Sequence, residues 1–255
     1  MNIGQLWKSI WPPLVAVILF LIVWQASTLI FGIDKWMLPS PVDITREAAA
    51  NKAGLWDHTL ATLRLILLGF VIGTSVGLIV AFVLHNIPIL KSSLYPLVIL
   101  SQNIPTIALA PLLMVWFGFG ILPKIIVITL VCFFPVAVAA MDGLRGTDRT
   151  MLNYMQMIGA SKIDIFRKLE LPSAIPSILS GVKIAATYSV MGAVIAEWIG
   201  AEKGIGYYMM LQKSSFRTDR IFVAITIIVV LSLGMFLCIS LLEKWIVRYK
   251  PDNRK

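Results

Sequence analysis

Six long apolar runs constrain this chain more than any other feature. Their approximate bounds are residues 11–31, 63–84, 94–117, 122–141, 175–199 and 221–247. A helix needs roughly 20 apolar residues, each adding about 1.5 Å, to cross the hydrocarbon core of a bilayer. The chain is 58% hydrophobic with a mean hydropathy of +0.87, too apolar for a soluble core of its length. The sequence therefore predicts an all-α, polytopic membrane protein with six transmembrane helices, forming a single domain over residues 1–255.

The positions of the 22 Lys and Arg residues indicate an orientation. These residues flank the apolar runs instead of forming one patch, which argues against nucleic acid as a partner. If the N-terminus is cytoplasmic, the basic loop after the fourth run and the basic C-terminal tail both lie on the inner side. That side then has the excess of Lys and Arg expected of cytoplasmic segments. We expect a multi-pass protein in contact with membrane lipid, with both termini cytoplasmic.

Small residues on the second run mark a surface suited to close helix packing. Gly69, Gly73 and Gly77 recur every four residues, so they lie on one face of a helix. Small residues at this spacing let two helix backbones approach closely. A neighbouring helix of the same chain and a second subunit both fit this face.

The third run combines prolines with polar residues at membrane depth. Pro96, Pro105 and Pro111 each remove a backbone hydrogen bond, which predicts a kinked helix. Polar groups are costly in lipid and should face inward. Those near the middle proline are candidates to line a translocation pathway, or serve only to bond helices together: Ser101, Gln102, Asn103 and Thr106. Glu197, near the outer end of the fifth run, is either an interfacial carboxylate paired with a basic loop residue or a group at an outer gate or partner contact.

The segment of about 142–172, between the fourth and fifth runs, is long for a membrane hairpin and is not of disordered composition. Apolar residues recur every three positions in two groups, Leu152, Met155 and Ile158, then Ile163, Phe166 and Leu169, which predicts two short helices. Gly159 permits a turn between them, and Ser161 with Asp164 fits an N-terminal capping box. An apolar face on such a pair suits a partner protein, although periodicity alone also allows it to lie on the membrane surface.

The same segment resembles the cytoplasmic loop of the membrane-spanning permease subunits of bacterial ABC-type importers. That family's signature is Glu-Ala-Ala, three residues, Gly, nine residues, an aliphatic residue, one more residue, then Leu-Pro. This chain matches it at Gly159, Leu169, Leu171 and Pro172, but has Asn-Tyr-Met at 153–155 in place of Glu-Ala-Ala. The stretches "MLPSPVDI", "LWDHTLATLRLILLGFVIG", "IPTIALAPLLMVWFGFG" and "GAVIAEWIG" are similar to the nitrate/sulfonate/taurine branch. "GVKIAATYSVMGAVIAEWIGAEKGIGYYM" is most similar to relatives that import pyrimidine precursors of thiamine.

The resemblance implies a non-catalytic permease subunit in the bacterial inner membrane. Two permease copies would form the pathway for a small polar solute (a sulfonate, nitrate, taurine or a pyrimidine-like compound), above an ATPase subunit dimer. An extracytoplasmic substrate-binding protein would deliver the solute. The coupling helix that contacts the ATPase would involve the following residues: Leu152, Met155, Ile158, Gly159, Ala160, Ser161, Ile163, Phe166, Leu169, Leu171 and Pro172.

The chain's own motifs agree with an energy source on another subunit. It has no Gly-x-x-x-x-Gly-Lys-Ser/Thr phosphate loop, and no pattern that predicts a metal site or another cofactor. Few ionisable residues lie deep in the runs, which disfavours coupling to an ion gradient. A secondary carrier or channel that works without an ATPase remains the alternative class.

Overall fold

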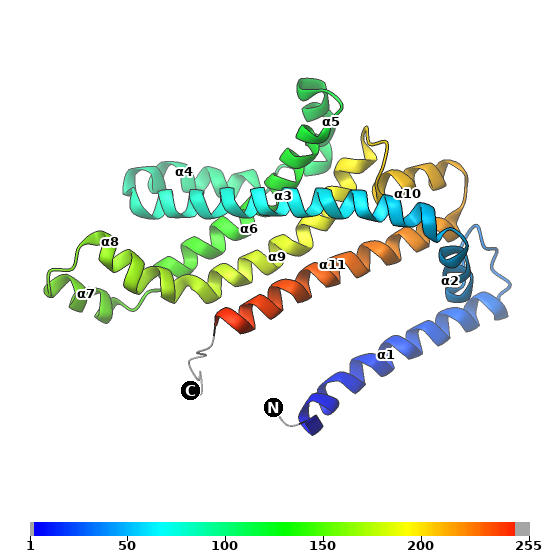
Figure 1. Cartoon of the computed structure of the whole chain (residues 1–255), viewed down its shortest axis with the longest axis horizontal. Coiled ribbons are helices and arrows are strands. Elements are labelled where there is room, and N and C mark those ends of the chain that lie inside the picture. The colour runs from blue at the N-terminus through cyan, green and yellow to red at the C-terminus, as the bar shows by residue number, and fades with distance from the viewer. Residues whose placement is uncertain (1–2, 248–255) are drawn as a thin grey trace.

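The computed structural model describes residues 3–247, with side chains from residue 11 onward (Figure 1). Every regular element in this part of the chain is helical. In chain order the elements are α1 (Ile3–Ile30), α2 (Pro41–Ala50), α3 (Lys52–Asn86), α4 (Pro88–Ser101), α5 (Thr106–Phe117), α6 (Ile121–Arg145), α7 (Arg149–Met157), α8 (Lys162–Ile165), the π-helical turn η1 (Phe166–Glu170), α9 (Leu171–Trp198), α10 (Ile205–Ser214) and α11 (Thr218–Ile246).

Five of the described helical segments are long and apolar enough to cross a membrane. They are Trp11–Ile30, Lys52–Asn86, Ile121–Arg145, Lys162–Trp198 and Thr218–Ile246. These segments correspond to five of the six predicted spans, with longer ends at several positions. The all-α class predicted from the sequence is confirmed.

The predicted third span differs from expectation. In place of one kinked helix over 94–117, α4 and α5 form a broken pair bent by 101°. Pro105 accounts for the break, because it disfavours helical geometry at Ile104 and has no N–H to donate. Pro96 and Pro111 lie within α4 and α5 and do not end them. The middle proline thus separates two helices, and the other two prolines are tolerated.

The core lies where α3, α6 and α9 pack side by side. The glycine face of α3 contacts α6 of the same chain. A methyl group on Gly69 would overlap Ile128, one on Gly73 would overlap Cys132, and one on Gly77 would overlap the Phe133 backbone. Glycine is required at these positions because the two helix backbones approach so closely. The glycine face is therefore a packing surface within the chain.

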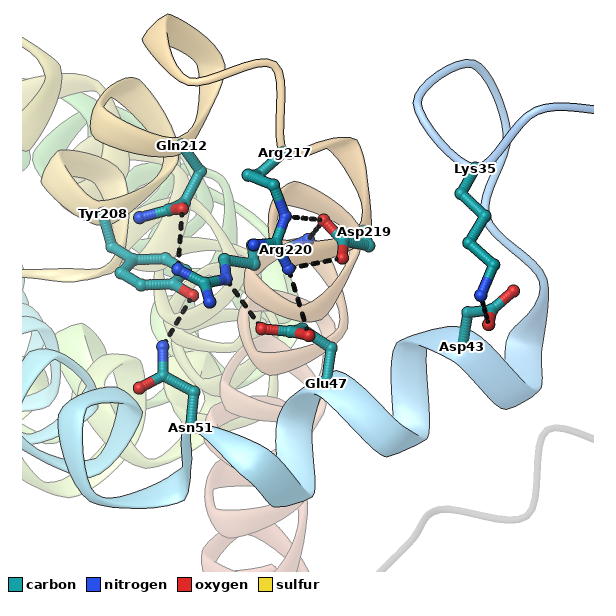
Figure 2. A network of polar contacts seen from close by, with 9 residues as sticks. All are labelled: Lys35, Asp43, Glu47, Asn51, Tyr208, Gln212, Arg217, Asp219 and Arg220. Atoms are coloured by element: carbon teal, nitrogen blue, oxygen red, sulfur yellow. Dashed lines mark hydrogen bonds and ion pairs between the residues drawn. The ribbon is translucent and has the colours of Figure 1, made fainter.

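At the end of the molecule formed by α2, α10 and the start of α11, charged side chains bond to one another (Figure 2). Glu47 of α2 accepts a hydrogen bond from Arg220 Nε at 2.7 Å and pairs with Arg217 Nη2 at 3.1 Å. Asn51 donates to the Tyr208 hydroxyl of α10 at 3.2 Å. This network joins three elements that are distant in sequence, and we call this end the α2/α10 end.

Candidate functional site

The segment between α6 and α9 forms a projection at the opposite end of the molecule. Figure 1 shows α7 and α8 beyond the ends of α6 and α9, on the side toward which the C-terminal end of α11 points. We call residues 148–165 the α7–α8 loop, and this end the loop end. The predicted pair of short helices is present.

Both helices of the α7–α8 loop have capped ends. Asp148 accepts hydrogen bonds from the backbone N–H groups of Thr150 and Met151 at the start of α7. At the end of α7, Gly159 has a φ of 79° and donates to the Gln156 carbonyl at 3.0 Å. The Ala160 N–H donates to the Met155 carbonyl at 3.0 Å, and these two bonds form a Schellman motif.

The predicted cap of α8 is also present. The Ser161 hydroxyl accepts from the Asp164 N–H at 3.2 Å and donates to the Asp164 carboxylate at 2.6 Å. These local bonds satisfy backbone groups that helix ends leave free. Local bonds within the loop therefore define the turn around Gly159.

An apolar patch covers the outer side of the α7–α8 loop. Its large side chains are all more than half exposed, from 55% at Met151 to 79% at Met157, and they are Met151, Tyr154, Met157, Ile158 and Ile163. Of the predicted apolar residues, Ile158 and Ile163 belong to this patch. Leu152 and Met155 are half-buried on the inner side of α7. The regular spacing of apolar residues predicted the helix, but it did not predict which of these residues face outward.

The remaining predicted coupling residues lie in the connection to α9. Phe166 turns away from the patch and packs edge-on against Phe82 of α3, with ring centroids 5.6 Å apart. Leu169 and Leu171 are half-buried, and Pro172 is exposed in the first turn of α9. No pattern in the sequence indicates that η1 adopts π-helical geometry.

A second site lies at the break between α4 and α5. A cavity of about 350 Å³ opens beside the break, and three of the predicted pathway residues, Ser101, Gln102 and Thr106, line it. Asn103, the fourth, is exposed but does not line the cavity. The break also leaves backbone groups at the ends of α4 and α5 without partners in their own helices, beside this cavity.

The sequence did not point to the cavity-lining residues of α6 and α9. These helices contribute three aromatic side chains, Phe133 and Phe134 of α6 and Tyr188 of α9, beside aliphatic ones. Each lies within a long apolar run, where nothing in the local pattern distinguishes a lining residue from a lipid-facing one. No charged residue lines the cavity in the part of the chain that the structure describes.

Glu197, the remaining pathway candidate, lies at the α2/α10 end and is only 2% exposed. Its carboxylate accepts from the Thr62 hydroxyl at 2.8 Å and from the Gly206 N–H at 2.8 Å. The Thr62 hydroxyl accepts from the Ile205 N–H at 2.7 Å. Glu197 and Thr62 thus satisfy free N–H groups at the start of α10, where a negative charge is also favoured by the helix dipole.

The same carboxylate borders a hollow of about 430 Å³ that also includes Lys124, Glu202 and Lys203. Gly204 lies against Glu197 with a φ of 125°, and a methyl group there would overlap the carboxylate. We call Thr62, Glu197, Gly204, Ile205 and Gly206 the Glu197 cluster. It positions α10 against α3 and α9.

Comparison with known proteins identifies relatives along nearly the whole chain. The formylaminopyrimidine transport permease protein ThiX of Halalkalibacterium halodurans is 32% identical, over 94% of this chain and 96% of the relative. The riboflavin transport system permease protein RibX of Chloroflexus aurantiacus is also 32% identical, over 98% and 96%. The taurine transport system permease protein TauC of Escherichia coli is 28% identical, over 89% and 85%.

Solved structures show the same fold at lower sequence identity. One described as an amino acid ABC transporter superposes with a TM-score of 0.65 at 18% identity, over 78% of this chain and 97% of that one. Residues 73–249 match the family described as the binding-protein-dependent transport system inner membrane component. Because the family match covers more than half of the chain and the relatives cover nearly all of it, the chain belongs to this family of ABC importer permeases.

Proposed function

We propose that two copies of this permease form the transmembrane pathway of an ATP-driven importer, with an ATPase subunit dimer docked on the two α7–α8 loops. The observation that carries the proposal is the apolar patch, presented on a capped loop that projects from the helix bundle. An extracytoplasmic binding protein would approach the α2/α10 end.

The exposure of the patch supports a protein partner. Met157 is 79% exposed, Ile158 62% and Ile163 69%. Covering a side chain of this size contributes roughly 1.5–3 kcal/mol by the hydrophobic effect. Because the loop's own backbone bonds are already satisfied, little ordering cost would oppose docking.

The orientation follows from the same assignment. An ATPase that uses cellular ATP must lie in the cytoplasm, so the loop end would be cytoplasmic. Arg145, Arg149, Lys162, Arg167 and Lys168 lie at or near the loop, as cytoplasmic segments favour. The C-terminal end of α11 would lie on this side, and we infer that both termini are cytoplasmic in the inner membrane.

For the solute, we infer a small, uncharged heteroaromatic compound such as an aminopyrimidine. The cavity at the α4–α5 break has apolar walls that include three aromatic side chains, together with the hydroxyl and amide groups of Ser101, Gln102 and Thr106. Such walls suit a flat ring, and the absence of a cationic lining residue disfavours sulfonate or nitrate. The relatives named for formylaminopyrimidine and riboflavin are more similar to this chain than the one named for taurine.

Two substitutions at Gly159 test the docking assignment. Gly159→Pro is incompatible with the φ of 79° and removes the N–H that bonds to Gln156, so it should disrupt the turn. Gly159→Asn is the control, because asparagine tolerates this left-handed geometry better than other residues. We expect tagged Gly159→Asn to co-purify with the ATPase subunit as the natural protein does, and Gly159→Pro to lose it.

The proposal fails if Gly159→Pro retains the ATPase fully, or if the natural protein does not bind it. Uptake of formylaminopyrimidine into vesicles driven by a proton or sodium gradient, without ATP or ATPase, would instead support a secondary carrier.

A further inference from the structure

The α7–α8 loop is connected to the helix bundle by more than the chain itself. His85, in the last turn of α3, places its Nε2 atom 3.0 Å from the Glu170 carboxylate of η1. The Phe166 ring packs against the same part of α3, with its centroid 5.6 Å from that of Phe82 and 6.2 Å from that of His85. The first and last residues of η1 thus contact two residues about one turn apart on α3.

This contact is sheltered from solvent. The side chains of His85 and Glu170 are 15% and 14% exposed, in contrast to the Lys168–Asp164 pair nearby, at 69% and 43%. A hydrogen bond to a carboxylate is stronger than one between neutral groups, and shielding from water strengthens it further. The pair is therefore suited to transmit a displacement, whereas the exposed pair is not.

The geometry of η1 indicates that the connection has a defined point of adjustment. A π-helical turn between α-helices is rare and is often found at functional positions. The Ser173 hydroxyl donates to the backbone carbonyls of Leu169 at 2.7 Å and Glu170 at 2.9 Å. Both carbonyls belong to the π-helical turn. Glu170 thus lies in a stabilised turn between α8 and α9.

The position of His85 in the chain links the loop to the cavity. His85 is followed by Asn86, where α3 ends, and α4 begins at Pro88. At its other end, α4 reaches Ser101, which lines the cavity at the α4–α5 break. A displacement of Glu170 that pulls on His85 therefore acts on the turn that carries α4 and, through α4, on the cavity.

We propose that His85 is a positioning residue for energy coupling, which transmits movement of the α7–α8 loop to α4 through its hydrogen bond with Glu170. This inference rests on the proposed function, because it assumes that an ATPase moves the loop. It adds a route to the cavity through the α3–α4 turn, separate from the direct continuation of the loop into α9.

The test uses the permease–ATPase complex in lipid nanodiscs and the binding protein purified with the solute that it retains. The readout is the ratio of ATP hydrolysis with the binding protein to that without it. His85→Leu removes the hydrogen bond and replaces the imidazole with an apolar side chain of similar size, whereas His85→Gln keeps an N–H donor. We expect the ratio to fall about tenfold in His85→Leu, as loss of one charge-assisted hydrogen bond implies, and to be largely restored in His85→Gln.

Asn86→Leu is the matched control. Asn86 is the adjacent residue, is exposed, and donates only to the Phe82 carbonyl of its own helix at 2.8 Å. We expect this variant to keep the ratio of the natural protein. All three variants should co-purify with the ATPase, because none alters the apolar patch.

An unchanged ratio in assembled His85→Leu overturns the proposal, as does an equal loss in the Leu and Gln variants. If His85→Leu does not assemble, Glu170→Leu and Glu170→Gln test the same bond from the other side. Only the Gln variant keeps an acceptor, so the same two outcomes apply. A natural complex that binds no ATPase would contradict the proposed function instead.

Discussion

At the α2/α10 end, charged and polar side chains bond to one another within the chain, whereas at the loop end large apolar side chains face outward. Glu47 pairs with two arginines, and Glu197 is almost fully buried with its carboxylate bonded to Thr62 and Gly206. On the α7–α8 loop, Met157 and Ile158 are mostly exposed although the backbone around them is capped. At the α2/α10 end these charged side chains have partners within the chain. At the loop end the backbone groups are bonded but the apolar side chains are uncovered.

This difference distinguishes an end whose polar groups bond within the chain from an end that leaves apolar side chains uncovered. The polar networks of the α2/α10 end join α2, α3, α9, α10 and α11 through bonds within the chain. The loop end satisfies its backbone but leaves apolar area that another protein can cover. Substitutions at the α2/α10 end should therefore affect the stability of the permease, and those at the loop end its assembly.

The largest expected effect is on stability, at the Glu197 cluster. Gly204→Ala places a methyl group against the Glu197 carboxylate at a φ of 125°, which residues with a side chain rarely adopt. We expect it to destabilise the permease by about 3 kcal/mol. Tryptophan fluorescence during thermal unfolding in detergent measures this change.

Gly234→Ala is the control, because a methyl group at Gly234 of α11 meets no atom within 4 Å. This variant should melt at or slightly above the temperature of the natural protein, because alanine is favoured over glycine inside a helix. Equal melting of the two variants would show that the Glu197 cluster does not hold the α2/α10 end together.

The next effect is on assembly, at the apolar patch. Ile158→Asp places a charge where the partner would cover an apolar side chain, so we expect the affinity for the ATPase subunit to fall about tenfold or more. Thermal stability should not change, because Ile158 is 62% exposed. Gln156→Asp, on the other side of α7, is the control for added charge. An Ile158→Asp variant that melts lower but binds the ATPase normally would reverse the contrast between the two ends.

The smallest effect concerns an exposed ion pair at the α2/α10 end. The Lys35 ammonium, 2.7 Å from Asp43, donates a hydrogen bond that holds the pKa of that carboxyl below its ordinary value. Because the Lys35 side chain is 71% exposed, Lys35→Ala should lower the free energy of unfolding by less than about 0.5 kcal/mol.

The direction with pH follows from the lowered pKa of Asp43. The pair stabilises the folded state when Asp43 is charged, so its contribution is present above the ordinary pKa and is lost as pH falls through the folded pKa. Melting of the natural protein and of Lys35→Ala should differ slightly at neutral pH and converge in acid. A difference that grows in acid would contradict this assignment.

Much of the loop could be predicted from the sequence because the signals are local. Gly159 and Ser161 form the predicted turn and cap, since left-handed geometry and capping involve atoms only a few residues apart. The direction of Phe166 could not be predicted, because it depends on α3, which is distant in sequence.

The cavity shows the same limit. Ser101, Gln102 and Thr106 were identified as polar residues beside a proline, but Phe133, Phe134 and Tyr188 had no local signal. The 101° bend was predicted only as a kink. The angle between α4 and α5 depends on packing against α6, which no local rule supplies.

The sequence by itself determined that the chain spans a membrane as helices and that a structured loop interrupts its spans, because length, hydropathy and capping are properties of short segments. Only the tertiary structure decided that the Gly69 face packs within the chain, that Glu197 is enclosed by α10, and that His85 meets Glu170. These contacts join residues far apart in sequence, and their geometry is fixed by how helices pack together.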